Sequence, residues 1–114
     1  LQVCSDPHAV PSRQQVYNRP NPPQHAYHVC YRSPWRNYLA WSVAKLMDDY
    51  GIDGVYLDGT EYLFPCSNEY HGCGYAGADG KRHDAYPIFA VRDLMKRLYP
   101  IVKTRTPNGQ INAH

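Results

Sequence analysis

The sequence has no long apolar run and no cluster of basic residues. Its longest purely apolar stretch is only a few residues, so we expect neither a membrane span nor the apolar core of a signal peptide. Twelve Lys and Arg against ten Asp and Glu leave a formal net charge of +2, without the basic stripe that is typical of nucleic-acid-binding proteins. A nucleic-acid partner is therefore not expected.

Several short functional motifs are also missing. There is no Gly-rich phosphate loop, no serine nucleophile elbow and no Cys/His nucleophile signature. The four cysteines are too few for a disulfide-framework miniprotein. The closest pair, Cys66 and Cys73, has the spacing C-x6-C rather than the C-x2-C of zinc ribbons. From these absences we expect no cofactor.

Tyrosine and proline, in contrast, are abundant. Eleven of the aromatic residues are Tyr, and ten residues are Pro, which indicates amphipathic rings held on ordered loops and favours a polar ligand. The 114 residues suffice for one domain or part of one. Because the chain starts at Leu1 without a Met, we expect it to be an excerpt of a longer protein.

The first half of the chain divides into an irregular segment and a strand followed by a helix. Residues 1–25 hold half of the prolines and show no periodicity, so we expect an extended Pro-rich loop. A short strand is predicted over 26–31, and Ser33 then precedes a helix over about 35–50. Gly51 stands where a left-handed C-terminal cap belongs. The helix is predicted from an apolar stripe at helical spacing: Leu39, Val43, Leu46, Met47 and Tyr50.

The second half repeats this alternation. A buried strand is predicted over 52–58, and the long segment 59–86 follows it without periodicity. A second amphipathic helix begins near Pro87, and Pro100 should kink or end it. The strand predicted over 110–114 completes the chain.

Strands and helices in this order predict an α/β fold with two consecutive βαβ units. Three strands and two helices cannot cover both faces of a sheet or pair both of its edges. We therefore expect residues 26–114 to be a fragment of a (β/α)8 TIM barrel catalytic domain, completed by sequence outside the excerpt and unable to fold alone. A doubly wound sheet is the second choice.

In such folds ligands bind at the carboxyl ends of the strands. Asp58 and His114 end two of the predicted strands, and side-chain alternation places Tyr56 and Asn112 on the same inner face. Asp58 is the predicted catalytic carboxylate. Glu61 could be the second carboxylate, because glycosidases use two carboxyl groups that lie about 5 to 9 Å apart. Both could instead be solvated or capping side chains.

The loop over 65–75 is the second candidate region, because it packs amide, imidazole and phenol groups between glycines. Such groups can bind sugar hydroxyls, and aromatic rings can stack on a pyranose. Cys66 and Cys73 could close this loop as a disulfide, remain free thiols, or bind zinc with His71 or His83. The predicted substrate-binding side chains outside the strands are Trp35, Tyr62, Asn68, His71 and Tyr75.

Three segments carry a resemblance to a known family: YGIDGVYLDGT at 50–60, PCSNEYHGCGY at 65–75, and the helix 87–103 that leads to INAH. Together they resemble bacterial glycoside-hydrolase-type TIM barrels related to glycoside hydrolase family 123, whose characterised members are β-N-acetylgalactosaminidases. The resemblance covers about residues 27–114. It implies a catalytic carboxylate at Asp58, at the end of a barrel strand.

The sequence departs from that family at the site itself. The family uses an adjacent Asp-Glu pair, whereas Gly59 and Thr60 separate Asp58 from Glu61 here. The acetamido-sugar mechanism is therefore in doubt. A direct nucleophilic role for Asp58, as in α-galactosidase-like barrels, stays open.

These observations lead to three hypotheses for function. The first is a glycoside hydrolase acting on a complex carbohydrate, in an extracytoplasmic location. The second is a carbohydrate-binding barrel without catalytic activity. The third is a zinc-dependent hydrolase built on His71, Cys73 and His114. A second carboxylate within about 10 Å of Asp58 would favour the first hypothesis over the second.

Overall fold

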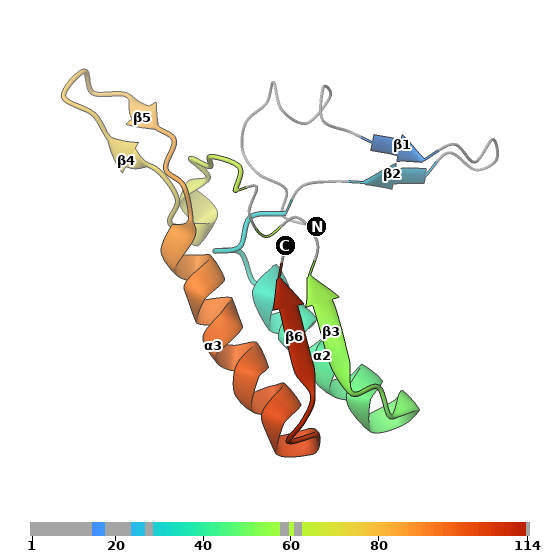
Figure 1. The fold of residues 1–114 in the computed structure, drawn as a ribbon. Helices are drawn as coiled ribbons and strands as arrows, with labels where there is room; N and C mark the ends of the chain where they lie inside the picture. The colour runs from blue at the N-terminus through green and yellow to red at the C-terminus, as the bar shows by residue number, and fades with distance from the viewer. Residues whose placement is uncertain (1–14, 18–23, 27–28, 58–59, 61–62, 114) are drawn as a thin grey trace.

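The computed structural model describes residues 15–17, 24–26, 29–57, 60 and 63–113. This part of the chain forms two long helices and three two-stranded sheets (Figure 1). The helices are α2 (Trp35–Tyr50) and α3 (Ile88–Arg105), and η1 (Glu69–His71) is a single 3-10 turn. The strands are β1 (Gln15–Tyr17), β2 (Gln24–Ala26), β3 (Gly54–Leu57), β4 (Tyr75–Ala76), β5 (Arg82–His83) and β6 (Gln110–Ala113).

Helix α2 occupies the residues that its apolar periodicity predicts. Pro34 caps it, and the Ser33 hydroxyl accepts a hydrogen bond from the Trp35 N–H at 3.3 Å. At the other end Gly51 has a φ of 65°, and its N–H donates to the Met47 carbonyl at 3.0 Å. This left-handed conformation is costly for residues with a Cβ, so glycine ends the helix here.

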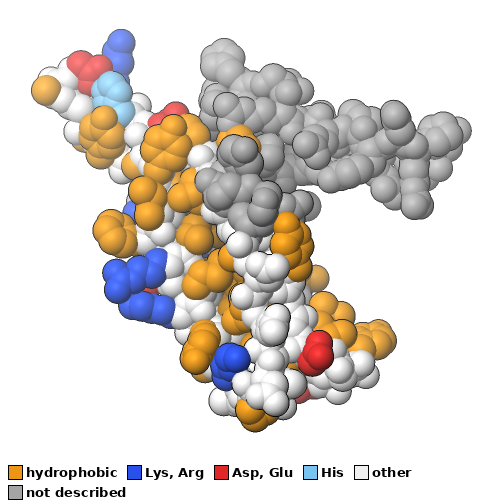
Figure 2. All heavy atoms as spheres, viewed as in Figure 1, with side chains coloured by type: hydrophobic (Ala, Val, Ile, Leu, Met, Phe, Trp, Pro, Cys, Tyr) orange, Lys and Arg blue, Asp and Glu red, His pale blue; other side chains and the backbone are white. Residues whose placement is uncertain are grey.

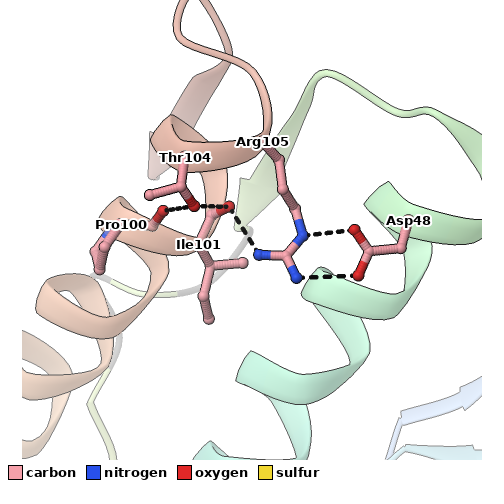
Figure 3. A network of polar contacts seen from close by, with 5 residues as sticks. All are labelled: Asp48, Pro100, Ile101, Thr104 and Arg105. Atoms are coloured by element: carbon pink, nitrogen blue, oxygen red, sulfur yellow. Dashed lines mark hydrogen bonds and ion pairs between the residues drawn. The ribbon is translucent and has the colours of Figure 1, made fainter.

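Helix α3 continues through its proline. Pro100 was expected to kink or end the helix, yet regular structure extends to Arg105. Pro100 is exposed, so water can bind the carbonyl that its missing N–H leaves without a partner. The Thr104 hydroxyl donates to the Pro100 carbonyl at 2.6 Å in the following turn (Figure 3).

The hydrophobic core lies between the two helices and one face of a small parallel sheet. β3 and β6 pair in parallel with Val55 opposite Ile111, and both side chains pack against the helices. The buried side chains of this core, which we call the helix core, come from both helices: Ala40, Val43, Met47, Leu94, Leu98 and Val102. Tyr56 and Asn112 are exposed, on alternate positions of the paired strands.

An ion pair joins the two helices near their C-terminal ends. The Arg105 guanidinium donates to both carboxylate oxygens of Asp48, at 2.7 and 3.0 Å (Figure 3). This bidentate geometry holds the pKa of the Asp48 carboxyl below its usual value, chiefly through the hydrogen bond from Arg105. Both side chains reach solvent, so the pair adds little to stability.

Regular structure also appears within 59–86, where the sequence predicted none. β4 and β5 form a hairpin that projects beyond the N-terminal end of α3 (Figure 1). The Gly77 N–H donates to the Lys81 carbonyl at 2.8 Å and closes the turn. Hydrophobic side chains stay exposed along the hairpin and α3 (Figure 2), among them Tyr75, Tyr86, Phe89 and Tyr99.

The predicted TIM-barrel fragment of three strands and two helices is wrong. The described residues form separate two-stranded sheets, and only β3 and β6 pair in parallel. The described residues of the strand predicted over 26–31 are not part of the β3–β6 sheet. Val29 makes a single bridge, and the Cys30 carbonyl accepts from the Ser33 N–H at 3.0 Å in a turn. This turn takes the backbone out of the extended conformation that a third parallel strand requires.

Near the N-terminus, β1 and β2 pair as an antiparallel hairpin. An extended loop was predicted for residues 1–25, and this strand pairing was not predicted. Among the described residues, no helix is both long enough and apolar enough to cross a membrane.

Candidate metal centre

Four side chains that carry metal-binding atoms meet beside the N-terminal ends of the helices. They are Cys30, Cys66, His71 and Cys73, which we call the cysteine cluster. One sulfur or nitrogen from each residue lies within 4.8 Å of the others. The three cysteines are almost fully buried, with exposures of 1%, 0% and 2%. Three sulfurs and an imidazole nitrogen form one of the usual ligand sets of structural zinc.

Cys30 is positioned by the turn that leads into α2. Its carbonyl accepts the Ser33 N–H, and Ser33 is itself completely buried. This turn brings Cys30 to the start of the helix, and its sulfur lies 3.4 Å from the Cys73 sulfur. The contact joins residues 43 positions apart in the chain.

Cys66 is held by the segment that precedes α3. It forms an antiparallel bridge with Ala85, with hydrogen bonds of 3.1 Å and 3.0 Å in the two directions. This bridge connects the beginning of the loop that contains Cys66, His71 and Cys73 to the residues just before α3. Phe64 packs against the buried cysteines and covers them.

His71 and Cys73 follow in a compact turn. We call residues 66–73 the metal loop. The Asn68 side-chain oxygen accepts a hydrogen bond from the Tyr70 N–H at 2.9 Å at the start of η1. The backbone carbonyl of Asn68 accepts a hydrogen bond from the Cys73 N–H at 3.0 Å. Gly72 ends η1 with a φ of 70°, which reverses the chain and places Cys73 next to His71.

The spacing of the donor atoms suits a tetrahedral ion. Zn–S bonds of about 2.3 Å and a Zn–N bond of about 2.0 Å place tetrahedral ligand atoms roughly 3.5 to 3.8 Å apart. The Cys73 sulfur lies 3.4 Å from the Cys30 sulfur and 3.4 Å from Nδ1 of His71. A small adjustment of the side chains would therefore enclose one ion.

The His71 side chain is half-buried, and its ring nitrogens have few partners. Nδ1 contacts the Cys73 sulfur, and Nε2 is buried without a hydrogen-bond partner among the described residues. Burying a polar nitrogen without a partner is unfavourable. A metal ion would give this ring the strong bond that the described side chains do not supply.

The surroundings of Cys73 disfavour a thiolate in the absence of a cation. Burial raises the pKa of the Cys73 thiol, and the neighbouring sulfurs of Cys30 and Cys66 raise it further. A divalent cation reverses this effect, because a coordinating thiol is deprotonated. Cys73 is therefore expected to become a thiolate together with the binding of an ion.

Of the alternatives for Cys66 and Cys73, the disulfide is not formed, since the described cysteines are thiols. The zinc alternative included two of the clustered cysteines and His71, but it lacked Cys30. Its other histidine, His83, lies outside the cluster. There Nε2 bonds the Asp79 carboxylate at 2.9 Å, and the ring stacks on Tyr75.

The other predicted substrate-binding side chains are spread over the molecule. Trp35 starts α2 and contacts the Tyr31 ring edge-on, with centroids 5.8 Å apart. Tyr56 and Asn112 are opposite each other on β3 and β6, while Tyr75 is on the hairpin. Asn68 shapes the metal loop. Asp58, Glu61, Tyr62 and His114 lie outside the described residues.

The residue that sequence reasoning missed is Cys30. It stands alone in the sequence, 36 positions before Cys66, so no local spacing connects it to the metal loop. Its only signal was its place before the predicted helix start. Comparisons with known proteins found no matching family model and no similar curated protein or solved structure.

Proposed function

We propose that this chain binds one zinc ion through Cys30, Cys66, His71 and Cys73, and that the ion has a structural role. The observation that carries the proposal is the approach of four donor atoms to within 4.8 Å of one another. Three buried thiols next to an imidazole form a site for a soft cation. This proposal replaces the expectation of no cofactor.

The ligand set favours zinc over other metals. Tetrahedral sites rich in thiolates select zinc or iron–sulfur clusters, whereas calcium and magnesium require oxygen ligands. The single imidazole of His71 favours a mononuclear zinc site of the Cys3His type. Four protein ligands complete the coordination shell and leave no position for a catalytic water. This completeness favours a structural ion over the zinc-dependent hydrolase.

The ion would join parts of the molecule that apolar packing does not connect strongly. Cys30 lies in the turn before α2, and the other ligands lie in the segment between β3 and α3. Among the described residues, only Phe64 adds partly buried apolar surface to the three cysteines. Zinc coordination therefore supplies the stabilisation that a small core lacks.

Metal analysis of the purified chain tests this proposal. We expect about one zinc per chain by inductively coupled plasma mass spectrometry. His71→Ala and Cys30→Ser should each lower the zinc content after dialysis against a weak chelator. His83→Ala is the matched control, because His83 bonds Asp79 outside the cluster. Protein that contains no zinc and takes up none would overturn the proposal.

A second function, cleavage of a glycosidic bond, is favoured by the β3–β6 pair. The strands are parallel and in register, with Leu57 opposite Ala113. The next residues along the chain are Asp58 and His114, and parallel strands end at the same edge of a sheet. The family resemblance is what suggests a carbohydrate substrate and a catalytic role for Asp58, which lies outside the described residues.

The two functions can be tested separately. Asp58→Asn should lower the rate of glycoside cleavage by orders of magnitude and leave the zinc content unchanged. Activity is measured on a panel of aryl glycosides, with Asp53→Asn as the control, because Asp53 precedes β3 at its other end. Cleavage that survives Asp58→Asn would contradict this role. Binding of oligosaccharides without cleavage would favour the carbohydrate-binding alternative.

A further inference from the structure

An arginine of the β4–β5 hairpin forms hydrogen bonds near both ends of the metal loop. Arg82 lies on β5, and its Nε donates to the Ser67 carbonyl at 2.7 Å. A terminal nitrogen of the same guanidinium donates to the Cys73 carbonyl. Ser67 follows the ligand Cys66 directly, and Cys73 is itself a ligand. One side chain thus connects the backbone of the ligand Cys73 to that of Ser67, the residue after the ligand Cys66.

The backbone packing around Gly74 brings the same segments together. A Cβ at this position would lie 2.6 Å from the His83 carbonyl and 2.9 Å from the Ser67 Cα. Gly74 also has a φ of 79°. The chain after Cys73 therefore passes between β5 and the start of the metal loop, at a distance that only glycine permits. This close approach puts the Arg82 guanidinium within reach of both carbonyls.

Electrostatics favours a cation at this place. Three thiolates and a neutral imidazole around Zn²⁺ give the centre a net charge of about −1. Arg82 brings a positive charge to the backbone of the centre. Hydrogen bonds from outer groups orient metal ligands and tune their affinity for the ion.

We propose that Arg82 is a positioning residue for the zinc centre: its guanidinium holds the carbonyls of Ser67 and Cys73 and thereby sets the separation of the Cys66 and Cys73 sulfurs. This inference rests on the proposed zinc site. A planar fork of donors can hold two carbonyls at once, which a single point donor does less well. The hairpin then acts as a support for the metal loop.

Zinc affinity of the full chain tests this role. Competition with a chromophoric chelator at fixed pH should show that Arg82→Met weakens zinc binding about 10- to 100-fold. Arg82→Lys should bind zinc more tightly than Arg82→Met and less tightly than the unmodified chain. Lys81→Met is the matched control, because it removes a neighbouring exposed cation from the hairpin and leaves the hydrogen bonds of Arg82 to Ser67 and Cys73 intact. It should bind zinc within about twofold of the unmodified chain.

A spectroscopic measurement separates ligand positioning from general stability. Co²⁺ substituted for zinc gives a thiolate charge-transfer band whose intensity follows the number of bound sulfurs. We expect Arg82→Met to lower this band per bound cobalt and Lys81→Met to preserve it. If Arg82→Met does not fold, Arg82→Lys is tested in the same way, and a band and affinity equal to those of the unmodified chain would overturn the inference.

The outcomes also distinguish the two proposals. An unmodified chain that binds neither zinc nor cobalt overturns the zinc site and the role of Arg82 together. Tight zinc binding by the unmodified chain, with the same affinity and spectrum in Arg82→Met, overturns only the role of Arg82. Equal losses in Arg82→Met and Lys81→Met would also overturn it, because they would indicate a general effect of charge.

Discussion

The helix core and the cysteine cluster are stabilised in different ways. The helix core buries aliphatic side chains from α2 and α3, and strand residues such as Val55 and Ile111 pack against them. The cysteine cluster buries three thiols and has only Phe64 as a partly buried apolar neighbour among the described residues. The first region gains stability from the hydrophobic effect, whereas the second offers ligands to an ion.

The two regions also differ in how much of each is set by local spacing within one helix. Leu94, Leu98 and Val102 recur every four residues, so they form one stripe on α3 as soon as the helix exists. The cluster instead depends on a contact between Cys30 and Cys73, 43 positions apart. Closing such a long loop costs entropy, which a metal ion bound at several points can offset.

Metal removal should have the largest effect on this comparison. Chelation of zinc should increase amide hydrogen exchange within 63–86 by 100-fold or more, since structural zinc contributes on the order of 10 kcal/mol to folding of small sites. The helix core should keep its helical circular dichroism. Exchange is measured by mass spectrometry before and after chelation. Equal loss of protection in α3 would mean that the two regions form one cooperative unit.

A cavity in the helix core should have the next largest effect. Leu98 is completely buried, so Leu98→Ala should lower the free energy of unfolding by about 2–5 kcal/mol. Leu46→Ala is the matched control, because Leu46 on α2 is 45% exposed, and it should cost about 0.5 kcal/mol or less. Urea denaturation in saturating zinc measures both values. Equal effects would contradict the assignment of Leu98 to the core.

The ion pair between the helices should have the smallest effect, with a defined pH dependence. Because Arg105 lowers the pKa of Asp48 in the folded state, the pair stabilises the fold above the unfolded pKa of about 3.9. That contribution is lost as the pH falls through the lower, folded pKa. Asp48→Asn should therefore slightly lower the melting temperature at pH 7 and have no effect at a pH well below the lowered, folded pKa of Asp48. An effect that persists there, or one that adds fully to Arg105→Met, would contradict the pairing.

Local patterns predicted the two helices and the parallel strands β3 and β6 well. The bounds of α2, its left-handed end at Gly51 and the position of β6 were each readable from periodicity and turn residues. The hairpin was missed, although Asp79-Gly80 is a turn signal of the kind found between short strands. Its two-residue strands are too short to show an alternating pattern.

Tertiary contacts could not be predicted from the same patterns. The segment 26–31 has the composition of a strand, but the turn at Cys30 directs it toward the metal loop instead. Sequence reasoning included His71, Cys66 and Cys73 in a zinc alternative and could not supply the fourth ligand, because Cys30 has no fixed spacing to them. The catalytic roles of Asp58 and Glu61 stay predictions.

Zinc K-edge X-ray absorption of the purified chain tests the central claim most directly. The account predicts one zinc per chain with three sulfur neighbours at about 2.3 Å and one nitrogen neighbour at about 2.0 Å. Cys30→Ser should reduce the sulfur shell from three to two. A shell of oxygen and nitrogen only, or a sulfur count that Cys30→Ser leaves unchanged, would contradict the cysteine cluster as the metal centre.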